Sequence, residues 1–194
     1  MDKSGIISHF KSTGALLDGH FLLTSGKHSN KYFEKFTLLS QPESVKDICK
    51  SISEEYARME IDMVVGAATG GIILAYEIGK QLNTKGIFAE RLNGELQFRR
   101  GFSLDKGQRI LLVDDVVTTG GSVIELIKLT KSTGAGIIGI AVMFDRTGGD
   151  IEFGYPFFAL HSEKIESWEQ GECPQCLQSV PLTKRGRTGK QIKP

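Results

Sequence analysis

The sequence is poor in cysteine and proline, and it lacks any long hydrophobic run. Its 194 residues include three cysteines and five prolines. Three cysteines are too few for the disulfide framework of a small secreted protein. No stretch approaches the ~18 consecutive apolar residues of a membrane-spanning helix, and residues 1–14 lack the apolar run of a signal peptide. These absences favour a soluble, cytoplasmic protein.

The sequence also lacks an excess of charge of either sign. It has 24 basic and 23 acidic residues, which leaves a net charge of +1. This balance provides no overall field that would attract a nucleic acid or a membrane surface, so an anionic ligand would have to be bound by local groups. Because 40% of the residues are hydrophobic, a chain of this length can bury a core without disulfides or a structural metal. We expect a single domain over residues 1–194.

Short apolar runs alternate with helical patterns from Pro42 onwards. Pro42 begins a helix whose apolar residues recur at helical spacing, namely Val45, Ile48, Cys49, Ile52 and Tyr56. Strands are predicted at residues 63–65, 86–89, 109–113, 137–144 and 157–160, with further helices at 72–82 and 123–131. Before them we expect a helix over about residues 2–17 and extended segments at 19–26 and 31–36. The alternation predicts an α/β fold with a central, mostly parallel sheet flanked by helices.

The segment at residues 90–108 differs from these strands because it is polar and basic. It contains Arg91, Arg99 and Arg100. Long loops inside compact domains are usually functional or disordered, and guanidinium groups match phosphate oxygens and keep their charge. We interpret the segment as a hairpin or flexible flap over an anionic ligand, with an ordinary solvated hairpin as the alternative.

Residues 110–123, ILLVDDVVTTGGSV, carry the strongest functional signal. An apolar strand leads into Asp114 and Asp115, and a Thr/Gly loop then enters a helix. Backbone N–H groups at a helix N-terminus bind phosphate, and carboxylates accept hydrogen bonds from sugar hydroxyls. The pattern therefore predicts a site for ribose 5-phosphate at the carboxyl end of the strand. The alternative is a plain strand end whose acids cap the next helix; the missing lysine before Ser122 argues against a nucleotide P-loop.

Other segments have two interpretations each. The loop at residues 66–71 could bind pyrophosphate through free N–H groups, or its glycines could permit a close helix–strand crossing. Arg146 follows a strand and could pair with a ligand carboxylate or form a structural salt bridge. Tyr32 and Phe33 could flank a planar base or belong to the core.

Cysteine and histidine give a weaker signal. Cys173-Pro-Gln-Cys176 has the spacing of half of a zinc site, but the third cysteine, Cys49, lies on an apolar helix face. A metal would need histidine or carboxylate ligands from elsewhere, and it stays open whether the two cysteines bind metal or pair. The histidines are scattered without a catalytic pair, and the basic tail at 184–190 is most simply a solvated terminus.

These motifs together resemble a known family. Residues 110–123 resemble the signature by which type I phosphoribosyltransferases bind 5-phosphoribosyl 1-pyrophosphate (PRPP). Residues 19–29, GHFLLTSGKHS, resemble the N-terminal hood of orotate phosphoribosyltransferases. Glu90-Arg91 with Arg99-Arg100-Gly101 resembles their catalytic flap, and Asp145-Arg146 resembles the site of their orotate-binding arginine.

The resemblance implies a type I phosphoribosyltransferase fold, with a hood at about 1–40, a core at about 41–160 and a tail at about 161–194. It implies Mg²⁺-dependent transfer of ribose 5-phosphate from PRPP to orotate, which gives orotidine 5'-monophosphate and pyrophosphate in pyrimidine biosynthesis. It also implies a homodimer in which the flap reaches the neighbouring subunit. Another base, either a purine or uracil, and a PRPP-sensing regulator without turnover are the competing readings.

The resemblance further implies individual roles. The PRPP-binding set would be Arg91, Asp114, Asp115, Val116, Val117, Thr118, Thr119, Gly120, Gly121 and Ser122. Orotate would contact Thr118 and Arg146, and the catalytic set would be Asp114, Asp115, Arg99 and Arg100. No side chain is assigned as a Mg²⁺ ligand, because the ion is held there mainly through substrate oxygens and water.

Two positions depart from the family pattern. Many relatives carry a flap lysine where this chain has Glu95, and many carry a lysine after the first core strand where this chain has Gly70. Arg99 or Arg100 would then take the flap role.

Overall fold

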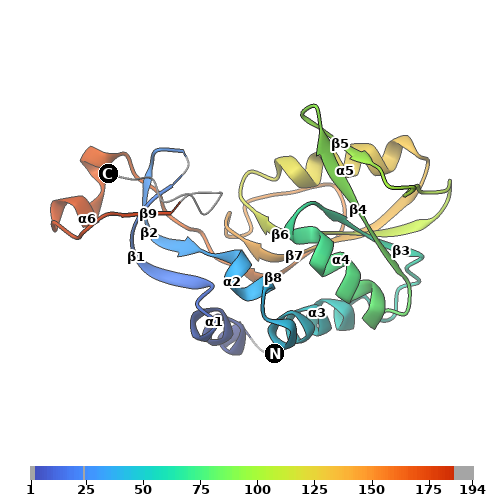
Figure 1. Cartoon of the computed structure of the whole chain (residues 1–194), viewed down its shortest axis with the longest axis horizontal. Helices are drawn as coiled ribbons and strands as arrows, with labels where there is room; N and C mark the ends of the chain where they lie inside the picture. Colours follow the sequence, from blue (N-terminus) through green and yellow to red (C-terminus); the bar gives the residue numbers. More distant parts are fainter. Residues whose placement is uncertain (1–2, 24, 186–194) are drawn as a thin grey trace.

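The structure, a computed structural model, describes residues 3–23 and 25–185 and contains two β-sheets (Figure 1). The larger sheet consists of β3 (Met63–Ala67), β4 (Lys85–Leu92), β5 (Glu95–Phe98), β6 (Arg109–Val117), β7 (Gly136–Asp145) and β8 (Phe157–Ser162). Its strand order is β5-β4-β3-β6-β7-β8, and every neighbouring pair is parallel except the antiparallel pair β4–β5. The mostly parallel α/β architecture expected from the sequence is confirmed.

Helices cover both faces of this sheet. One face packs against α3 (Pro42–Tyr56) and α4 (Gly70–Gln81), and the other against α5 (Gly121–Ser132). Each face has its own hydrophobic cluster, which explains why the central strands are continuously apolar. None of the helices in the described part of the chain is long and apolar enough to cross a membrane.

Side chains of β6 alternate between the two faces. Leu111 and Val113 pack in the α3–α4 cluster, whereas Ile110 and Leu112 pack in the α5 cluster. Successive residues of a strand point in opposite directions. Asp114 and Asp115 therefore leave the strand towards different sides of the sheet.

The strand order places the loops of interest together. The chain runs from β3 to β4 on one side, whereas β6, β7 and β8 extend on the other. In open parallel sheets, ligands bind at the carboxyl ends of the strands where the order reverses. That point lies between β3 and β6, where the segments at residues 66–71 and 116–122 lead from each strand into the next helix.

A smaller sheet, which we call the hood, joins the two ends of the chain. Its strands are β1 (Leu16–Leu22), β2 (His28–Phe33) and β9 (Thr183–Lys184), in the order β2-β1-β9. The short elements beside them are α1 (Lys3–Ser12), α2 (Lys35–Leu39), the 3₁₀ turn η1 (Gln170–Glu172) and α6 (Pro174–Leu177). In Figure 1 the blue and red ends of the chain lie together, to one side of the larger sheet.

Several sequence-based boundaries were wrong. The helix expected over residues 2–17 ends at Ser12, because a turn with a positive φ of 73° at Gly14 precedes β1. The segment expected as extended at 31–36 gives way to α2 at Lys35. Strand β6 continues to Val117, so the two acids lie within the strand rather than after it. In the basic tail, Lys184 belongs to β9, and residues 186–190 lie outside the described residues.

Candidate functional site

A cavity of about 210 Å³ lies at the carboxyl end of β6. Asp114 and the loop that follows β6 line it together with Arg91 from β4 and Glu125 from α5. The other residues at the cavity are Val116 and Val117 at the end of β6, Thr118, Thr119 and Gly120 of the loop, and Gly121, Ser122 and Val123 at the start of α5. The structure thus brings together most of the predicted PRPP-binding set, with the exception of Asp115.

The cavity is bordered by the N-terminus of α5. Gly120 precedes this helix with a left-handed φ of 76°, and a Cβ atom there would lie 2.5 Å from Ile151 Cδ1. No side chain caps the helix. The alternative interpretation, in which Asp114 and Asp115 cap it, is therefore wrong. The first N–H groups of a helix have no intrahelical partner, which makes this end suited to a phosphate.

Asp114 is a buried acid at the cavity. Asp114 is only 8% exposed, and its Oδ1 accepts a hydrogen bond from the Asp115 backbone N–H at 2.8 Å. Burial raises the pKa of Asp114 to about 7, and the neighbouring negative charge of Asp115 contributes to the rise. Near neutral pH this carboxyl can therefore exchange a proton as well as accept a hydrogen bond.

Asp115 points away from the cavity towards Lys35. Its Oδ2 lies 2.6 Å from Lys35 Nζ, at the start of α2. A Cβ atom at Gly70 would lie 1.6 Å from the same Oδ2, so a side chain there would collide with the carboxylate. Lys35 therefore supplies the positive charge beside this acid, close to the position where many relatives have a lysine and this chain has Gly70.

Arg146 is a half-buried cation that forms no ion pair within residues 3–23 and 25–185. It follows β7, and its backbone N–H donates to the carbonyl of Val117 at 2.9 Å, which places it beside the loop after β6. Burial lowers the pKa of Arg146, and its buried Nε has no hydrogen-bond partner. Among the residues that the structure describes, no acid forms an ion pair with it, so the structural salt bridge considered from the sequence is not formed.

The preceding acid, Asp145, has a structural role instead. Its carboxylate accepts hydrogen bonds from Ser162 Oγ at 2.7 Å, from Thr147 N and Oγ1 at 2.8 and 2.7 Å, and from Gly149 N at 2.9 Å. Burial alone would raise the pKa of Asp145, but these hydrogen bonds outweigh it and hold the pKa below its ordinary value. Asp145 therefore fixes the turn that carries Arg146.

The two neighbouring aromatic residues of β2 have different surroundings. Phe33 stacks on Phe144 with ring centroids 4.6 Å apart and meets Phe10 at 5.2 Å, so it belongs to the core. Tyr32 is half-buried; burial raises the pKa of its hydroxyl, while the positive charge of Arg146 acts to lower it. Tyr32 thus remains the aromatic residue available on the Arg146 side of the hood.

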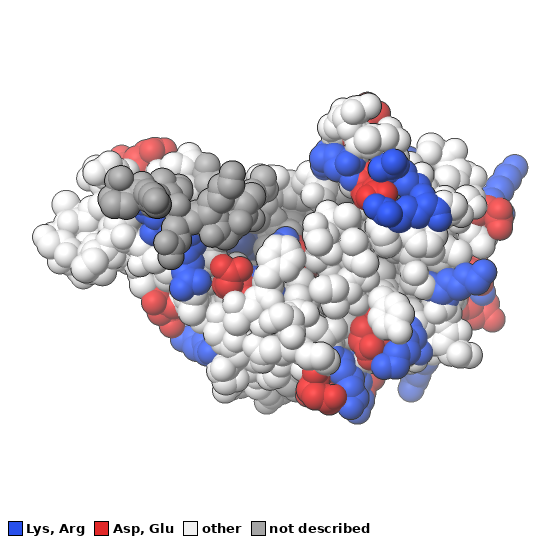
Figure 2. Space-filling model, in the orientation of Figure 1, with Lys and Arg blue, Asp and Glu red and all other residues white. Residues whose placement is uncertain are grey.

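The basic segment forms the hairpin that the sequence predicted. Strands β4 and β5 are joined by Asn93 and Gly94, both with positive φ (52° and 92°), as a tight hairpin turn requires. Figure 2 shows basic side chains gathered around acidic ones where this hairpin projects.

The three flap arginines do not act alike. Arg91 lines the cavity and pairs with Glu125 across 2.7 Å. Arg99 and Arg100 pair with Glu90, at 3.5 and 3.0 Å, and do not line the cavity. In this conformation of the chain, Arg91 is the flap arginine that could reach a ligand directly.

The loop at residues 66–71 is tightly packed. A Cβ atom at Gly66 would lie 2.0 Å from the carbonyl oxygen of Gly71. A close helix–strand crossing therefore accounts for Gly66, and no side chain caps α4, which begins at Gly70 beside Asp115.

Sequence reasoning did not select Lys35, His20 or His28. Folding brings Lys35 to Asp115, and it brings the two histidines to Cys173 and Cys176. No local spacing in the sequence indicates these contacts. The sequence signal for Lys35 was its position directly after Tyr32, Phe33 and Glu34, at the start of a short apolar helix.

Comparisons with known proteins agree with this architecture. Residues 37–175 match the model of the phosphoribosyl transferase domain. The orotate phosphoribosyltransferase of Caldicellulosiruptor bescii is 43% identical over 96% of this chain and 98% of its own length, and that of Chlorobium phaeobacteroides (strain DSM 266) is 41% identical over 98% and 99%.

Solved structures share the fold. The orotate phosphoribosyltransferase of Aeropyrum pernix aligns with a TM-score of 0.65 at 27% identity, over 81% of this chain and 93% of that one. Adenine phosphoribosyl transferase from Trypanosoma brucei aligns with a TM-score of 0.61 at 19% identity, over 78% of each chain, which shows the fold alone. Because these relatives are 43% and 41% identical over almost the whole chain, the chain belongs to the orotate phosphoribosyltransferase family.

Proposed function

We propose that this chain transfers ribose 5-phosphate from PRPP to orotate, with Mg²⁺, to give orotidine 5'-monophosphate and pyrophosphate. The observation that carries the proposal is the pairing of two features at one sheet edge. The cavity at the N-terminus of α5 suits a phosphorylated sugar, and beside it Arg146 holds a half-buried guanidinium with no counter-ion among the described residues. A phosphate and a carboxylate are the groups that these two features would bind.

The phosphate end of PRPP would bind the loop after β6. Backbone N–H groups at the start of α5 and the hydroxyls of Thr118, Thr119 and Ser122 are its donors. Asp114 and Asp115 would accept hydrogen bonds from the ribose hydroxyls. Because Asp115 is paired with Lys35 at 2.6 Å, this arrangement requires Lys35 to move or to share the carboxylate.

Orotate would bind between the hood and the end of β7. Its carboxylate would pair with Arg146 as a bidentate ion pair, and Tyr32 would lie near its ring. A base without a carboxylate would leave the half-buried cation unpaired, and buried polar groups that a ligand fails to pair strongly disfavour that ligand. The site therefore favours orotate over uracil.

The reaction forms a bond between a ring nitrogen of orotate and the anomeric carbon of PRPP. The bond from that carbon to pyrophosphate breaks, and pyrophosphate leaves with the electron pair, while the ring nitrogen gives up its proton to pyrophosphate or water. Charge develops on the leaving group and on the sugar, so the chain's task is electrostatic stabilisation and exclusion of water. Arg91 at the cavity, with Arg99 and Arg100 on the same hairpin, would stabilise pyrophosphate when the flap closes.

Mg²⁺ fits the oxygen donors at this edge of the sheet. Carboxylates are ligands that this ion accepts, but it usually keeps waters and binds through substrate phosphates. Within the described residues, the carboxylates here form no cluster of three ligands, so Asp114 and Asp115 would contact the ion mainly through PRPP and water. When bound, the ion would neutralise charge on pyrophosphate.

The proposal includes a homodimer in which the flap completes the partner's site. Arg99 and Arg100 pair with Glu90 rather than line this chain's cavity, and they would exchange Glu90 for the pyrophosphate bound in a neighbouring subunit. Mixing an Arg99→Ala/Arg100→Ala chain with an Asp114→Asn chain should then restore part of the activity that each lacks alone. A cytoplasmic location belongs to the same proposal, since a reducing compartment keeps cysteines as thiols.

The direct test is a panel of bases with PRPP and Mg²⁺. We expect loss of orotate absorbance and release of pyrophosphate with orotate, and turnover lower by at least about 10³-fold with uracil, hypoxanthine or adenine. Equal or faster turnover with another base would refute the assignment of orotate. Binding of PRPP without turnover of any base would refute the enzymatic proposal.

A further inference from the structure

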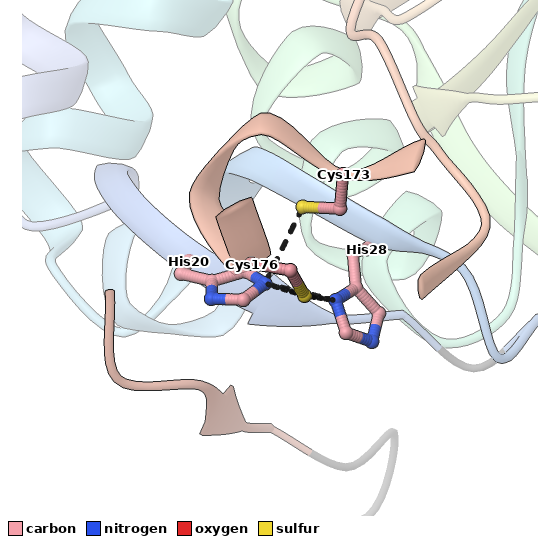
Figure 3. Close-up of side chains that lie close together, drawn as sticks. All are labelled: His20, His28, Cys173 and Cys176. Atoms are coloured by element: carbon pink, nitrogen blue, oxygen red, sulfur yellow. Dashed lines mark hydrogen bonds between the residues drawn. The ribbon is translucent and has the colours of Figure 1, made fainter. Parts of the chain in front are cut away.

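Four side chains from opposite ends of the sequence meet in the hood. His20 of β1 and His28 of β2 lie beside Cys173 and Cys176, which flank the start of α6. One nitrogen or sulfur atom of each residue lies within 4.8 Å of all the others. Figure 3 shows these atoms pointing towards one another, with the imidazoles contributed by the hairpin and the thiols by the C-terminal segment.

The spacing of these atoms matches a tetrahedral metal site. Ordinary zinc bond lengths place two nitrogens about 3.3 Å apart and a nitrogen and a sulfur about 3.6 Å apart. Here His20 Nε2 lies 2.8 Å from His28 Nδ1, 3.5 Å from Cys173 Sγ and 3.7 Å from Cys176 Sγ, and His28 Nδ1 lies 3.2 Å from Cys176 Sγ. Small shifts would therefore seat one ion among the four atoms.

The tautomer of His20 is set for binding a metal. Its Nδ1 lies 2.8 Å from the carbonyl oxygen of Val180, an acceptor, so Nδ1 carries the proton. Nε2 is then the unprotonated nitrogen, and it faces the two sulfurs and His28. A histidine that donates its other N–H to a backbone carbonyl is the usual outer-shell arrangement of a protein metal site.

The local backbone also aims His20 inwards. The β1–β2 ladder changes register between Asp18 and Phe21, where Gly19 and His20 oppose the single residue Asn30. Such a bulge redirects a side chain. As a result His20 and His28 are both only 3% exposed.

Hydrophobic packing contributes little to the position of the C-terminal segment, residues 170–185, beyond its strand pairing with β1. Its large apolar residues are exposed: Leu177 at 77%, Val180 at 37% and Leu182 at 37%. Up to Arg185, where the described residues end, its regular structure consists of η1, the four residues of α6 and the two residues of β9. Cys173, in contrast, is fully buried. Hydrophobic burial therefore does not explain why this segment folds back on the hood.

We propose that His20, His28, Cys173 and Cys176 bind one structural zinc ion that ties the C-terminal segment to the hood. The mixed thiolate and imidazole set suits zinc among the common ions. Four protein ligands leave no open position, so the ion is structural and not catalytic. Because the ligands come from both ends of the chain, binding closes a long loop and stabilises the folded state. The proposal is independent of which base the enzyme uses.

Metal content of the purified full chain tests the proposal. The protein is expressed without a histidine tag, kept reduced, and measured by plasma mass spectrometry for all transition metals. We expect about one zinc ion per chain. Cys176→Ser and His28→Asn should each lower zinc at least fivefold, while Cys49→Ala, which removes the thiol outside the cluster, should retain it.

A second measurement uses the unaltered chain, in case the variants fail to fold. Zinc is removed with a chelator under reducing conditions and replaced with Co²⁺. We expect intense visible bands of tetrahedral cobalt with a thiolate charge-transfer band, both lost on adding zinc, and a Tm of the metal-free chain about 5–10 °C below that of the loaded chain.

The outcomes decide the matter in either direction. Wild-type protein that contains no transition metal and gives no thiolate–cobalt spectrum overturns the proposal, because the cluster is then a hydrogen-bonded pair of histidines beside free or disulfide-bonded cysteines. Zinc that persists in a Cys173→Ser/Cys176→Ser chain, or that is lost equally from Cys49→Ala, overturns the assigned ligands. Orotate turnover is not the readout, so failure here leaves the proposed function untouched.

Discussion

The loop after β6 and the cluster in the hood are built in opposite ways. The loop is one continuous stretch of sequence carried by a buried strand, and it lines a cavity. The cluster is assembled from residues near both ends of the chain, and it lies beside a segment that exposes three of its apolar side chains.

The difference separates two uses of polar side chains. At the loop, hydrophobic packing of β6 provides the fold, so the acids and hydroxyls are not needed for the core and could serve a ligand. In the hood, the proposed zinc ligands would themselves help to hold the fold together. Changes at the loop should therefore act on activity, and changes at the cluster should act on stability.

The largest expected effect is at the two acids. Asp114→Asn with Asp115→Asn should lower kcat by at least about 10³-fold, because the ribose hydroxyls and the developing charge lose their carboxylates. Steady-state kinetics measures the loss, and circular dichroism and zinc content should match wild type. Near-normal turnover in a correctly folded double variant would refute the assigned role of the acids.

Arg146→Ala should affect orotate selectively. Loss of a charge-assisted ion pair to the carboxylate should raise the KM for orotate by roughly 10–100-fold, while the KM for PRPP changes little. The two constants are measured by varying each substrate at saturating levels of the other. An equal rise in both KM values would contradict the assignment of orotate to Arg146 and of PRPP to the loop after β6.

The flap arginines should differ within a single chain. Arg91→Ala should lower kcat/KM by roughly 10-fold through lost phosphate contact, because Arg91 lines the cavity. Arg99→Ala should act only through the shared site of a dimer, so its activity should recover when it is mixed with Asp114→Asn chains. An Arg99→Ala loss that mixing never relieves would argue against flap exchange between subunits.

The smallest expected effect is on the free energy of unfolding. It comes from Asp114, so a residue at the loop should affect stability as well as activity. Because burial raises the pKa of Asp114 to about 7 in the folded chain, the unfolded chain loses its proton first as pH rises from about 4 to about 7. Folding is then penalised above that window. Asp114→Asn removes the penalty and should raise stability at pH 8 by the order of 1–4 kcal/mol.

Thermal unfolding at two pH values checks the sign. We expect Asp114→Asn to have a higher Tm than wild type at pH 8 and a much smaller advantage near pH 4, close to the unfolded pKa. An equal difference at both values would mean that titration of Asp114 is not its cause.

The sequence was sufficient for features that are local. Four apolar residues ending in two acids located β6 and its loop, and helical periodicity located α3 from Pro42 to Tyr56. The polar segment at residues 90–108 was predicted as a hairpin or flexible flap, and its first part forms the β4–β5 hairpin. The direction of each acid was not predicted, because it depends on β6 continuing to Val117 and on strand alternation.

Features that depend on distant partners could not be predicted. Lys35 pairs with Asp115 only because α2 packs near the carboxyl end of β6. Cys173 and Cys176 had the spacing of half a metal site, but no pattern indicated which histidines would complete it. Only the fold brings His20 and His28 to them.

The central claim is that the loop after β6 and the two acids hold the ribose 5-phosphate of PRPP. A crystal structure with PRPP and Mg²⁺ tests it most directly. We expect the 5-phosphate within hydrogen-bond distance of the backbone N–H groups at residues 118–122, the ribose hydroxyls on Asp114 and Asp115, and Lys35 displaced from its 2.6 Å pairing with Asp115. A vacant cavity with the ligand bound elsewhere, or Asp115 still paired only with Lys35, would contradict the claim.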